Sequence, residues 1–333
     1  MSELVSILIP AYNAEKWITQ TVKSALAQTW PRKEIIIVDD GSTDNTLKIA
    51  RKLESKTVKV ITQQNTGASG ARNKALSFAQ GDYIQWLDAD DLLAPDKISH
   101  QLKDGEITNN SDILISSSYA RFYYRHQKAT FIPNVLWQDL TPVEWLLKKF
   151  YENAWMNPAV WLVSRKLTNL AGLWNERLSL DDDGEYFSRL VSVSEKVKFI
   201  PEAKCYYRIG NLGSLSRRTS DKACKSLVLS LSLCINYLRS LEESERSRIA
   251  CIEYLQTWYN YFYPEKSALR REIEALAYEL GGNLLPVDIN WKYSPVKIFF
   301  GWKVAKKLMD NLRKSKLLAF KNWDRFLYTI SPK

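Results

Sequence analysis

Three carboxylates fall within four positions at the end of a strand-length apolar run. Residues 83–87 read Tyr-Ile-Gln-Trp-Leu, and Asp88, Asp90 and Asp91 follow them. Carboxylates packed this closely repel one another, so a fold that keeps them needs a strong cation nearby. An oxygen-only ligand set without His or Cys suits Mg²⁺ or Mn²⁺, which also bind substrate phosphates. The alternative is a solvated acidic turn that caps the next helix.

A second group of carboxylates fills residues 181–185, which read Asp-Asp-Asp-Gly-Glu. Carboxylates can accept or donate protons in catalysis, so these residues are a second candidate for chemistry. The alternative is an exposed acidic helix start, because Asp is favoured in a first helical turn.

The composition narrows the chemistry that the chain can perform. The 333 residues are 45% hydrophobic and 25% charged, which is enough for a sizeable core and more than one domain of common size. The histidines are His100 and His126 alone, which nearly excludes Ser-His-Asp triads and His-rich metal sites. Four widely spaced cysteines without a CxxC pair favour reduced thiols over disulfides or zinc.

The positive charge is concentrated in the tail. The net charge is +10, and residues 284–333 hold 11 Lys and Arg against 3 Asp and Glu, so the rest is nearly neutral and no nucleic-acid partner is expected. Residues 297–309 and 316–325 mix basic and aromatic side chains. This suits either an anionic membrane surface or a helical bundle packed on the body with its lysines solvated.

The sequence predicts a cytoplasmic chain, with peripheral attachment to the inner face of the plasma membrane as its further expectation. The first apolar run begins at once, without a signal peptide. No run approaches the roughly 18 apolar residues of a membrane-spanning helix.

Apolar runs alternate with helical patterns over the first third of the chain. Strands are expected at residues 4–9, 34–38, 58–61, 83–87 and 112–116. Helical patterns separate the first four, and the first of these helices is expected to be capped by Asn13. This order predicts an α/β fold with a mostly parallel sheet and helices on both faces. Ligands of such sheets lie beyond the carboxyl ends of the strands, where four polar or glycine-rich segments are expected to converge.

Four motifs, in order and spacing, resemble the family 2 glycosyltransferases of the GT-A fold. They occupy residues 5–15, 37–44, 67–73 and 87–91. The resemblance covers roughly residues 3–215. It implies a GT-A catalytic domain at residues 1–218, followed by a helical, basic C-terminal extension at residues 219–333. It also implies metal-dependent, inverting transfer of a sugar from a nucleotide-diphosphate donor, with a UDP-sugar as the first choice. The implied acceptor is a glycan or glycolipid of cell-envelope or exopolysaccharide assembly.

The resemblance assigns donor-site roles by position. The residues implied are Pro10, Ala11, Tyr12, Glu15, Asp40, Arg72, Asp88 and Ala89. Tyr12 is implied to pack on the base, and Glu15 to meet the ribose or base side. Asp40 is implied to accept a hydrogen bond from uracil, because a carboxylate selects a base edge that presents a donor. Its alternative is an Asx-turn with helix capping.

The same resemblance gives the metal ligands and their neighbours. Asp90, together with Asp88, is implied to hold Mn²⁺ or Mg²⁺. Arg72 would meet the diphosphate or brace the acids, and an ordinary surface arginine is the alternative. Asp91 would support the ligands or cap the helix near residue 95.

Residues 181–185 resemble the Glu-Asp motif of the family. An Arg follows the motif's Asp by six positions, so Arg189 selects Asp183 as the base and places Asp182 where Glu is usual. A slip of one residue leaves Asp182 as the alternative. Tryptophan-rich residues 155–161 and 172–176 flank the route to the base, on the acceptor side or in the core. Residues 206–218 resemble the flexible segment that closes over the donor.

At two positions in that flexible segment the chain departs from the family. Ile209 and Gly210 stand where members often carry a His, so the resemblance supplies no third protein ligand for the metal.

Two other functions fit parts of the pattern. A nucleotidyltransferase on a similar sheet would need a Gly-rich, Lys- or Arg-bearing loop after the first strand, which residues 11–15 lack. A non-catalytic sugar-nucleotide-binding or scaffold protein docked at a membrane would need no base such as Asp183. NAD binding is discounted, because residues 67–70 do not form the GxGxxG fingerprint.

Overall fold

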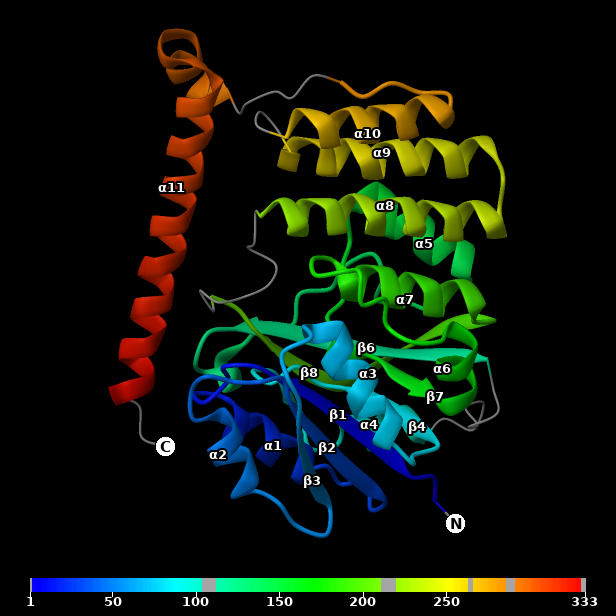
Figure 1. Ribbon diagram of the computed structural model, residues 1–333, viewed down its shortest axis with the longest axis vertical. Coiled ribbons are helices and arrows are strands. Elements are labelled where there is room, and N and C mark those ends of the chain that lie inside the picture. The colour runs from blue at the N-terminus through cyan, green and yellow to red at the C-terminus, as the bar shows by residue number, and fades with distance from the viewer. Residues whose placement is uncertain (1, 104–111, 211–219, 263–265, 286–290, 331–333) are drawn as a thin grey trace.

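The computed structural model describes residues 2–103, 112–210, 220–262, 266–285 and 291–330. A sheet lies beneath a stack of helices, and one long helix stands at the side (Figure 1). The strands are β1 (Val5–Ala11), β2 (Lys33–Asp39), β3 (Val58–Thr62), β4 (Tyr83–Trp86), β5 (Leu92–Leu93), β6 (Ile113–Phe122), β7 (Leu162–Ser164) and β8 (Lys196–Arg208). The helices are α1 (Ile18–Leu26), α2 (Thr46–Arg51), α3 (Ala68–Phe78), α4 (Lys97–Leu102), α5 (Pro142–Glu152), α6 (Arg165–Ala171), α7 (Asp182–Val193), α8 (Asp221–Leu241), α9 (Glu245–Phe262), α10 (Ser267–Glu279) and α11 (Ser294–Ile330).

Within the described residues the strands form one sheet in the order β3-β2-β1-β4-β7-β6-β8-β5. Strand β1 pairs in parallel with β2 and β4, and β2 pairs in parallel with β3. Strands β1 and β2 are rich in Val and Ile and almost wholly buried, as parallel strands covered by helices are. The predicted α/β fold is confirmed, and its parallel half lies where the sequence indicates.

The other half of the sheet is mixed. Strand β7 is antiparallel to both β4 and β6, while β6 and β8 are parallel. The interpretation of residues 206–208 as part of a flexible segment is wrong, because they pair with residues 120–122 of β6 as the end of strand β8. The later part of that segment, residues 211–219, lies outside the described residues.

The carboxyl ends of β1, β2 and β4 lie at one edge of the sheet. The register places Ala11 beside Asp39 and Leu8 beside Trp86, so the residues that follow each strand emerge on the same side. The predicted convergence of strand ends is confirmed. Helix α1 begins at Ile18 rather than near Asn13, whose φ of 50° is left-handed. The Oδ1 atom of Asn13 instead accepts a hydrogen bond from the backbone N–H of Thr43 at 2.8 Å.

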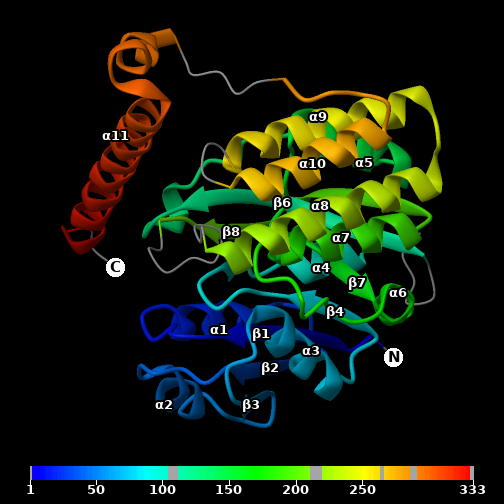
Figure 2. The ribbon, with the colours of Figure 1, turned by 45° about the horizontal axis from the view of Figure 1, so that its top comes forward.

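Helices α8, α9 and α10 form a layer on the side of α7 that faces away from the sheet (Figures 1 and 2). Buried side chains of α8, among them Leu227, Leu231 and Cys234, belong to the main core. Phe150 of α5 stacks on Tyr254 of α9, with ring centroids 4.3 Å apart. The predicted helical extension is confirmed, and as far as α10 it packs on the body. A division at residues 218 and 219 remains a prediction.

Helix α11 differs from the others in its surroundings. It runs along one side of the molecule (Figure 1), and a non-helical Gly301, with φ of 81°, separates its first turns from the rest. Nearly all of its side chains between residues 311 and 320 are exposed. None of the helices in the described ranges is long and apolar enough to cross a membrane.

Candidate active site

Arg72 connects the two acidic groups. It lies in the first turns of α3, and its side chain is only 6% exposed. Its Nη1 atom donates to Oδ2 of Asp182 at 2.6 Å, and its Nη2 atom donates to Oδ1 of Asp88 at 2.9 Å. The guanidinium also stacks over Trp174, 4.2 Å from the ring centroid. Arg72 is therefore a brace between the acids, and the alternative of an ordinary surface arginine is wrong.

These contacts also fix the charge of Arg72. Burial alone would lower the pKa of Arg72, but the carboxylates of Asp88 and Asp182 hold it above its usual range. A charged guanidinium in a poorly solvated place makes strong, charge-assisted hydrogen bonds to both acids. The end of β4 and the start of α7 are thereby held together through one side chain.

Asp183 has a different environment from Asp182. Its Oδ2 atom accepts a hydrogen bond from the indole N–H of Trp155 at 3.1 Å, whereas Asp182 is bonded to Arg72 and lies 3.4 Å from the Ser69 hydroxyl. Burial raises the pKa of Asp183 to about 7, with repulsion from Asp182 and Asp181 adding to it and Arg72 opposing it. A carboxylate with this pKa is suited to accept a proton near neutral pH.

The segment before Asp183 is held by a helix that comes later in the chain. Ser226 of α8 accepts hydrogen bonds from the backbone N–H groups of Ser179 (2.8 Å) and Leu180 (3.0 Å). Ser230, one turn further along α8, donates to Oδ2 of Asp181 at 2.7 Å. Asp181 has a left-handed φ of 60°, a conformation that such contacts stabilise.

Two features set the direction in which α7 starts. A Cβ atom on Gly184 would lie 2.1 Å from Oδ1 of Asp181, so only glycine fits beside that turn. Glu185 is buried, and both of its carboxylate oxygens accept from Arg189, at 2.8 and 3.1 Å. Tyr237 of α8 donates to the same carboxylate at 2.6 Å. Arg189 pairs with Glu185 within α7, and it also donates to the carbonyl of Leu173 at 3.0 Å, so it ties α7 to the segment after α6.

The three acids after β4 separate into two kinds. Asp91 is fully buried, and it accepts from the backbone N–H of Arg208 at 2.8 Å and from the amide of Asn157 at 3.4 Å. Burial raises the pKa of Asp91 well above its usual range, and Asp90 and Asp88 add to the shift. Asp91 ties the rim to β8, so its interpretation as a helix cap is wrong. Asp88 and Asp90 are partly exposed at the rim.

The chemistry of Asp88 and Asp90 fits a hard divalent cation. Both offer carboxylate oxygens and both are partly exposed, next to a loop that leads into a helix. Within the ranges that the structure describes, no three His, Cys, Asp or Glu residues form a metal-binding group. Mg²⁺ and Mn²⁺ commonly take one or two carboxylates and complete their shell with water and substrate phosphate oxygens. A two-carboxylate site is consistent with that pattern.

Asp40 orders the loop ahead of α3. Its Oδ1 atom accepts from the side chain of Gln63 (2.8 Å) and the backbone N–H of Thr66 (2.9 Å), and its Oδ2 atom accepts from the backbone N–H of Gly67 (2.9 Å). The Asx-turn expected in this region belongs to Asp39, which accepts from the N–H of Ser42 at 3.2 Å. Recognition of uracil by Asp40 remains a prediction.

The other donor-site residues lie at the same rim. Pro10 and Ala11 are the last residues of β1, and Tyr12, next along the chain, is 47% exposed. Glu15 is engaged by the next loop, because its Oε2 atom accepts from the backbone N–H of Asn45 at 3.1 Å. The carbonyl of Ala89 accepts from the hydroxyl of Thr21 in α1 at 2.9 Å.

Of the tryptophans in residues 155–161 and 172–176, two lie in the core and one lies at the candidate site. Trp161 and Trp174 are at most 2% exposed and belong to the core, although Trp174 also supports Arg72. Trp155 is partly exposed, contacts Asp183, and lies 5.0 Å from the ring of Tyr207. Of the expected acceptor-side aromatics, Trp155 is thus placed beside the candidate base.

Arg208 and Tyr207 belong to the donor-closing segment expected at residues 206–218, but the sequence assigns neither of them a contact of its own. Arg208 donates to the carbonyl of Asp90 at 2.8 Å and to the side chain of Gln20 at 2.7 Å, and it stacks over Trp17 at 3.9 Å. Burial raises the pKa of Tyr207, and Asp91 and Asp183 add to the shift. The alternation of polar and apolar residues from 196 to 200 is the one signal for the strand that carries both.

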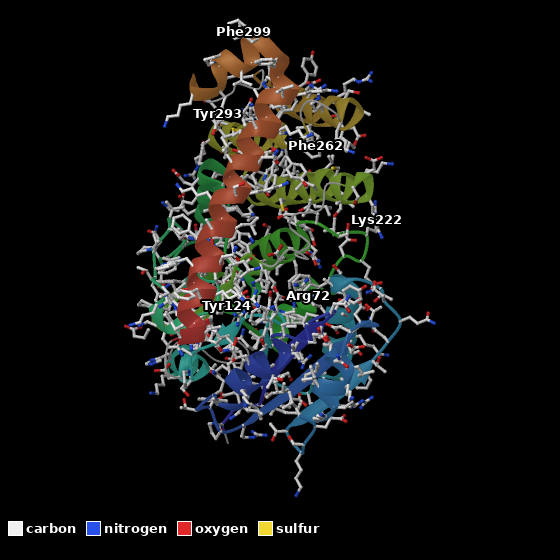
Figure 3. The ribbon with its side chains drawn as sticks, turned by 90° about the vertical axis from the view of Figure 1, so that its left-hand side faces the viewer. Arg72, Tyr124, Lys222, Phe262, Tyr293 and Phe299 are labelled. Atoms are coloured by element: carbon white, nitrogen blue, oxygen red, sulfur yellow. The ribbon has the colours of Figure 1, made fainter. Side chains whose placement is uncertain are left out.

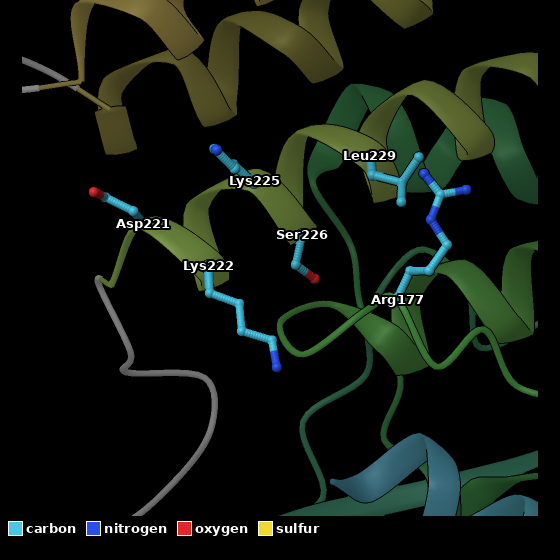
Figure 4. Close-up of a pocket in the computed structure, with 6 residues that line it drawn as sticks. All are labelled: Arg177, Asp221, Lys222, Lys225, Ser226 and Leu229. Atoms are coloured by element: carbon cyan, nitrogen blue, oxygen red, sulfur yellow. The ribbon is translucent and has the colours of Figure 1, made fainter. Parts of the chain in front are cut away.

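A basic pocket of about 460 Å³ lies beside α8 (Figure 4). It is lined by Arg177, Asp221, Lys222, Lys225, Ser226 and Leu229. Asp221 forms an ion pair with Lys266. Ser226 is the residue that holds the segment before the base, so this pocket borders the acidic site without containing its carboxylates.

Comparison with known sequences identifies relatives of this chain. The family model described as "Glycosyl transferase family 2" matches residues 6–161. The glycosyltransferase GlyG of Streptococcus pneumoniae serotype 4 is 31% identical over 234 residues, which is 66% of this chain and 75% of that protein. The Escherichia coli UDP-Glc:alpha-D-GlcNAc-diphosphoundecaprenol beta-1,3-glucosyltransferase WfaP is 50% identical over 101 residues, which is 30% of this chain and 40% of that protein.

Solved structures share the fold at lower identity. TarS of S. aureus, residues 1–349 in complex with UDP-GlcNAc, superposes with a TM-score of 0.67 at 18% identity, covering 83% of this chain and 81% of that one. The mannosyltransferase PcManGT of Pyrobaculum calidifontis, in complex with GDP-Man and Mn²⁺, gives a TM-score of 0.56 at 16% identity, with 97% and 88% coverage. At these identities the likeness establishes the architecture alone.

Proposed function

The chain belongs to glycosyltransferase family 2, and on that premise we propose that it is a metal-dependent, inverting enzyme that moves a sugar from UDP to a hydroxyl acceptor. The observation that carries the proposal is the bridge made by Arg72. It holds Asp88, at the rim proposed to bind the metal, to Asp182, the neighbour of Asp183, whose pKa burial raises to about 7. The proposed donor and acceptor sites would thereby lie next to each other.

The donor is proposed to enter along the carboxyl ends of β1 and β2. The half-exposed Tyr12 would pack on the base, above Pro10 and Ala11. Asp40 would offer the free acceptor capacity of its Oδ2 atom to the imide N–H of uracil. The relative WfaP is named for UDP-Glc, and the TarS structure holds UDP-GlcNAc, which supports uracil as the base. The GDP-Man complex of PcManGT makes guanine the competing base.

Asp88 and Asp90 would hold Mn²⁺ or Mg²⁺ against the donor diphosphate. The metal would supply Lewis-acid neutralisation of the departing UDP. Arg72 holds one oxygen of Asp88, and Arg208 holds the backbone carbonyl of Asp90. These contacts place the two residues before any ligand arrives, which would favour binding with little reorganisation.

Asp183 is proposed as the general base. It would take the proton from the acceptor hydroxyl while that oxygen bonds to the anomeric carbon and the bond from this carbon to the β-phosphate oxygen of UDP breaks. A single displacement of this kind inverts the anomeric configuration, so an α-linked donor gives a β-linked product. Asp182 is the less suited alternative, because it is already paired with Arg72.

The acceptor is proposed to lie over Trp155 and Tyr207, next to Asp183. Aromatic faces pack well on sugar rings, and these two rings are 5.0 Å apart. A glycan or glycolipid of cell-envelope or exopolysaccharide assembly is the proposed acceptor class. WfaP is named for an acceptor sugar carried by diphosphoundecaprenol. An acceptor of that kind requires the enzyme to meet the inner face of the plasma membrane.

Calorimetric titration with UDP, GDP, CDP and ADP, each with and without Mn²⁺, tests the donor and metal proposals. Mn²⁺-dependent UDP binding that is lost in Asp90→Asn is the expected result. The surface variant Asp139→Asn is the matched control and should bind normally. Tighter binding of GDP would overturn the assignment of Asp40. Failure of folded protein to bind any of the four would favour a scaffold role.

A further inference from the structure

Helix α11 carries an apolar stripe that the body of the protein does not cover. Between residues 302 and 330 six exposed, large apolar side chains fall within a sector of about 120°, taking 3.6 residues per turn. We call them the outer stripe: Leu308, Leu312, Phe320, Trp323, Phe326 and Ile330. All six are exposed, and Trp323 is exposed by 61%.

The body contacts a different side of the same helix. Asp324 accepts from Nε of Arg125 at 2.7 Å and from the backbone N–H of Tyr124 at 2.9 Å. Lys321 donates to the carbonyl of Gly210 at 2.6 Å, and Tyr328 lies against Tyr124 with ring centroids 5.9 Å apart. These three α11 residues lie about 130° around the helix from the centre of the outer stripe. The helix therefore docks with its polar side and turns its apolar side to the surroundings.

A second apolar group lies beyond Gly301. Ile298, Phe299 and Phe300 are each at least 69% exposed, and Phe299 lies at the end of the molecule furthest from the sheet (Figure 3). Monomeric soluble proteins rarely leave large apolar patches exposed, so we expect an interaction partner to cover this face.

The net charge of α11 indicates which kind of partner would cover the outer stripe. Residues 294–330 hold nine Lys and Arg against two Asp, a net charge of +7. A second copy of the helix would bring two such charges together, which like-charge repulsion opposes. An anionic lipid surface would accept the basic side chains at the headgroups and the aromatic side chains at the acyl boundary.

The docked end of α11 is connected to the acidic rim. Tyr124, which contacts Tyr328 and Asp324, also lies against Trp17, with ring centroids 5.6 Å apart. Trp17 is in turn covered by Arg208, which holds the carbonyl of Asp90. A continuous series of contacts therefore connects α11 to the rim through the side chains of Tyr328, Tyr124, Trp17 and Arg208.

We propose that α11 lies in the surface of an anionic bilayer with its outer stripe inward, and that the Asp324–Arg125 contact fixes how the acidic rim faces the lipid. The inference rests on the location given in the proposed function, but not on its donor, metal or base. A vesicle experiment without nucleotide therefore tests it separately, and UDP titration without vesicles tests the chemistry.

The first experiment is flotation of the full chain with vesicles of phosphatidylcholine, with and without 30% phosphatidylglycerol. The wild type should float with the anionic vesicles and be released by high salt. The variant Phe320→Ser/Trp323→Ser/Phe326→Ser should lose about tenfold or more in binding. The matched control Leu317→Ser/Leu318→Ser, whose residues are exposed but lie off the stripe, should bind nearly as the wild type does.

Three outcomes would overturn the proposal. The first is an equal loss of vesicle binding in the stripe variant and the control variant, and the second is wild-type vesicle binding by the stripe variant. The third is a wild type that light scattering shows to be a dimer and a stripe variant that is a monomer. The last would assign the stripe to a second copy of the chain. Unchanged UDP binding and circular dichroism in the stripe variant would establish that its loss of flotation is not misfolding.

The second experiment tests the contact at Asp324. Hydrogen exchange should show residues 16–20 and 122–126 protected when the wild type is bound to anionic vesicles. Asp324→Ala should still float but lose that protection, because α11 is no longer fixed to the rim. Protection at the wild-type level in Asp324→Ala would contradict the orienting role while leaving vesicle binding in place.

Discussion

The Nη1 atom of Arg72 lies 2.6 Å from Oδ2 of Asp182, while the neighbouring Asp183 bonds to the indole of Trp155. The two adjacent carboxylates therefore have different hydrogen-bond partners. Asp183→Asn should lower kcat by roughly 10²- to 10⁴-fold, because it removes the proton acceptor, and should leave UDP affinity within a fewfold. Single-turnover rates and titration of UDP measure the two effects.

The matched variant Asp182→Asn should behave differently. It leaves Arg72 with one partner in a buried place, so the protein should lose stability and the affinity for UDP should fall with the displaced Asp88. If Asp183→Asn kept near-wild-type turnover while Asp182→Asn abolished it, the assignment of the base would move by one residue.

The pH profile should report the base directly. Burial and the neighbouring acids raise the pKa of Asp183 to about 7, and the ionised form is the proton acceptor. kcat/KM should therefore rise with pH through about 7 and level off above it. A profile that is flat between pH 6 and 8 would argue against a base with this pKa.

The indole of Trp155 donates to the charged form of Asp183, so its removal should disfavour that form. In Trp155→Phe the rising limb of kcat/KM should move to higher pH. Trp137→Phe is the control, because the indole N–H of Trp137 has no hydrogen-bond partner among the described residues and its ring stacks on Phe199. An equal shift in both variants would indicate a general effect of losing a tryptophan.

Arg72→Met should destabilise the fold more than any exposed ion-pair variant. It leaves Asp88 and Asp182 without their buried counter-ion, a loss of about 3–5 kcal/mol for a pair of this kind. Arg51→Met, which breaks an exposed pair with Glu54, should cost less than about 1 kcal/mol. Urea unfolding measures both free energies, and similar values for the two variants would contradict the bracing role.

Truncation separates the two halves of the C-terminal extension. A chain that ends at residue 218 lacks Ser226 and Ser230, which hold the segment before Asp183, and lacks the buried face of α8. It should show no cooperative thermal transition. A chain that ends at residue 284 keeps these contacts and should unfold cooperatively and bind UDP. Cooperative unfolding of the shorter chain would show that residues 1–218 fold alone.

The parallel half of the sheet and its rim could be predicted because their signals are local. Runs such as residues 34–38 are continuous and β-branched, and Asp88 follows its strand directly. Strand β7 has only three residues, which are too few to show the alternation of side chains that is typical of a strand. Strand β8 contains Pro201 at an irregularity in its pairing with β6, which interrupts the alternation.

The contacts that the sequence does not indicate act over long separations. Arg208 meets the carbonyl of Asp90 from 118 positions away, and Ser226 meets Leu180 from 46. The motif at residues 206–208 indicates a segment near the donor but not its partner, and a serine in an amphipathic helix carries no signal. The acidic residues could be recognised in the sequence, because carboxylates that repel one another are seldom spaced so closely. Their hydrogen-bond partners could be identified only in the structure.

The dependence of residues 179–181 on α8 bears on the order of events during synthesis. When Asp183 leaves the ribosome, Ser226 and Ser230 have not yet emerged, so their hydrogen bonds to Leu180 and Asp181 cannot form. The nucleotide-facing strands can pair early, because β1 to β4 end by residue 86. The proposed base is therefore seated only after at least 47 further residues have emerged. The nascent enzyme would be able to hold a donor before it could use one.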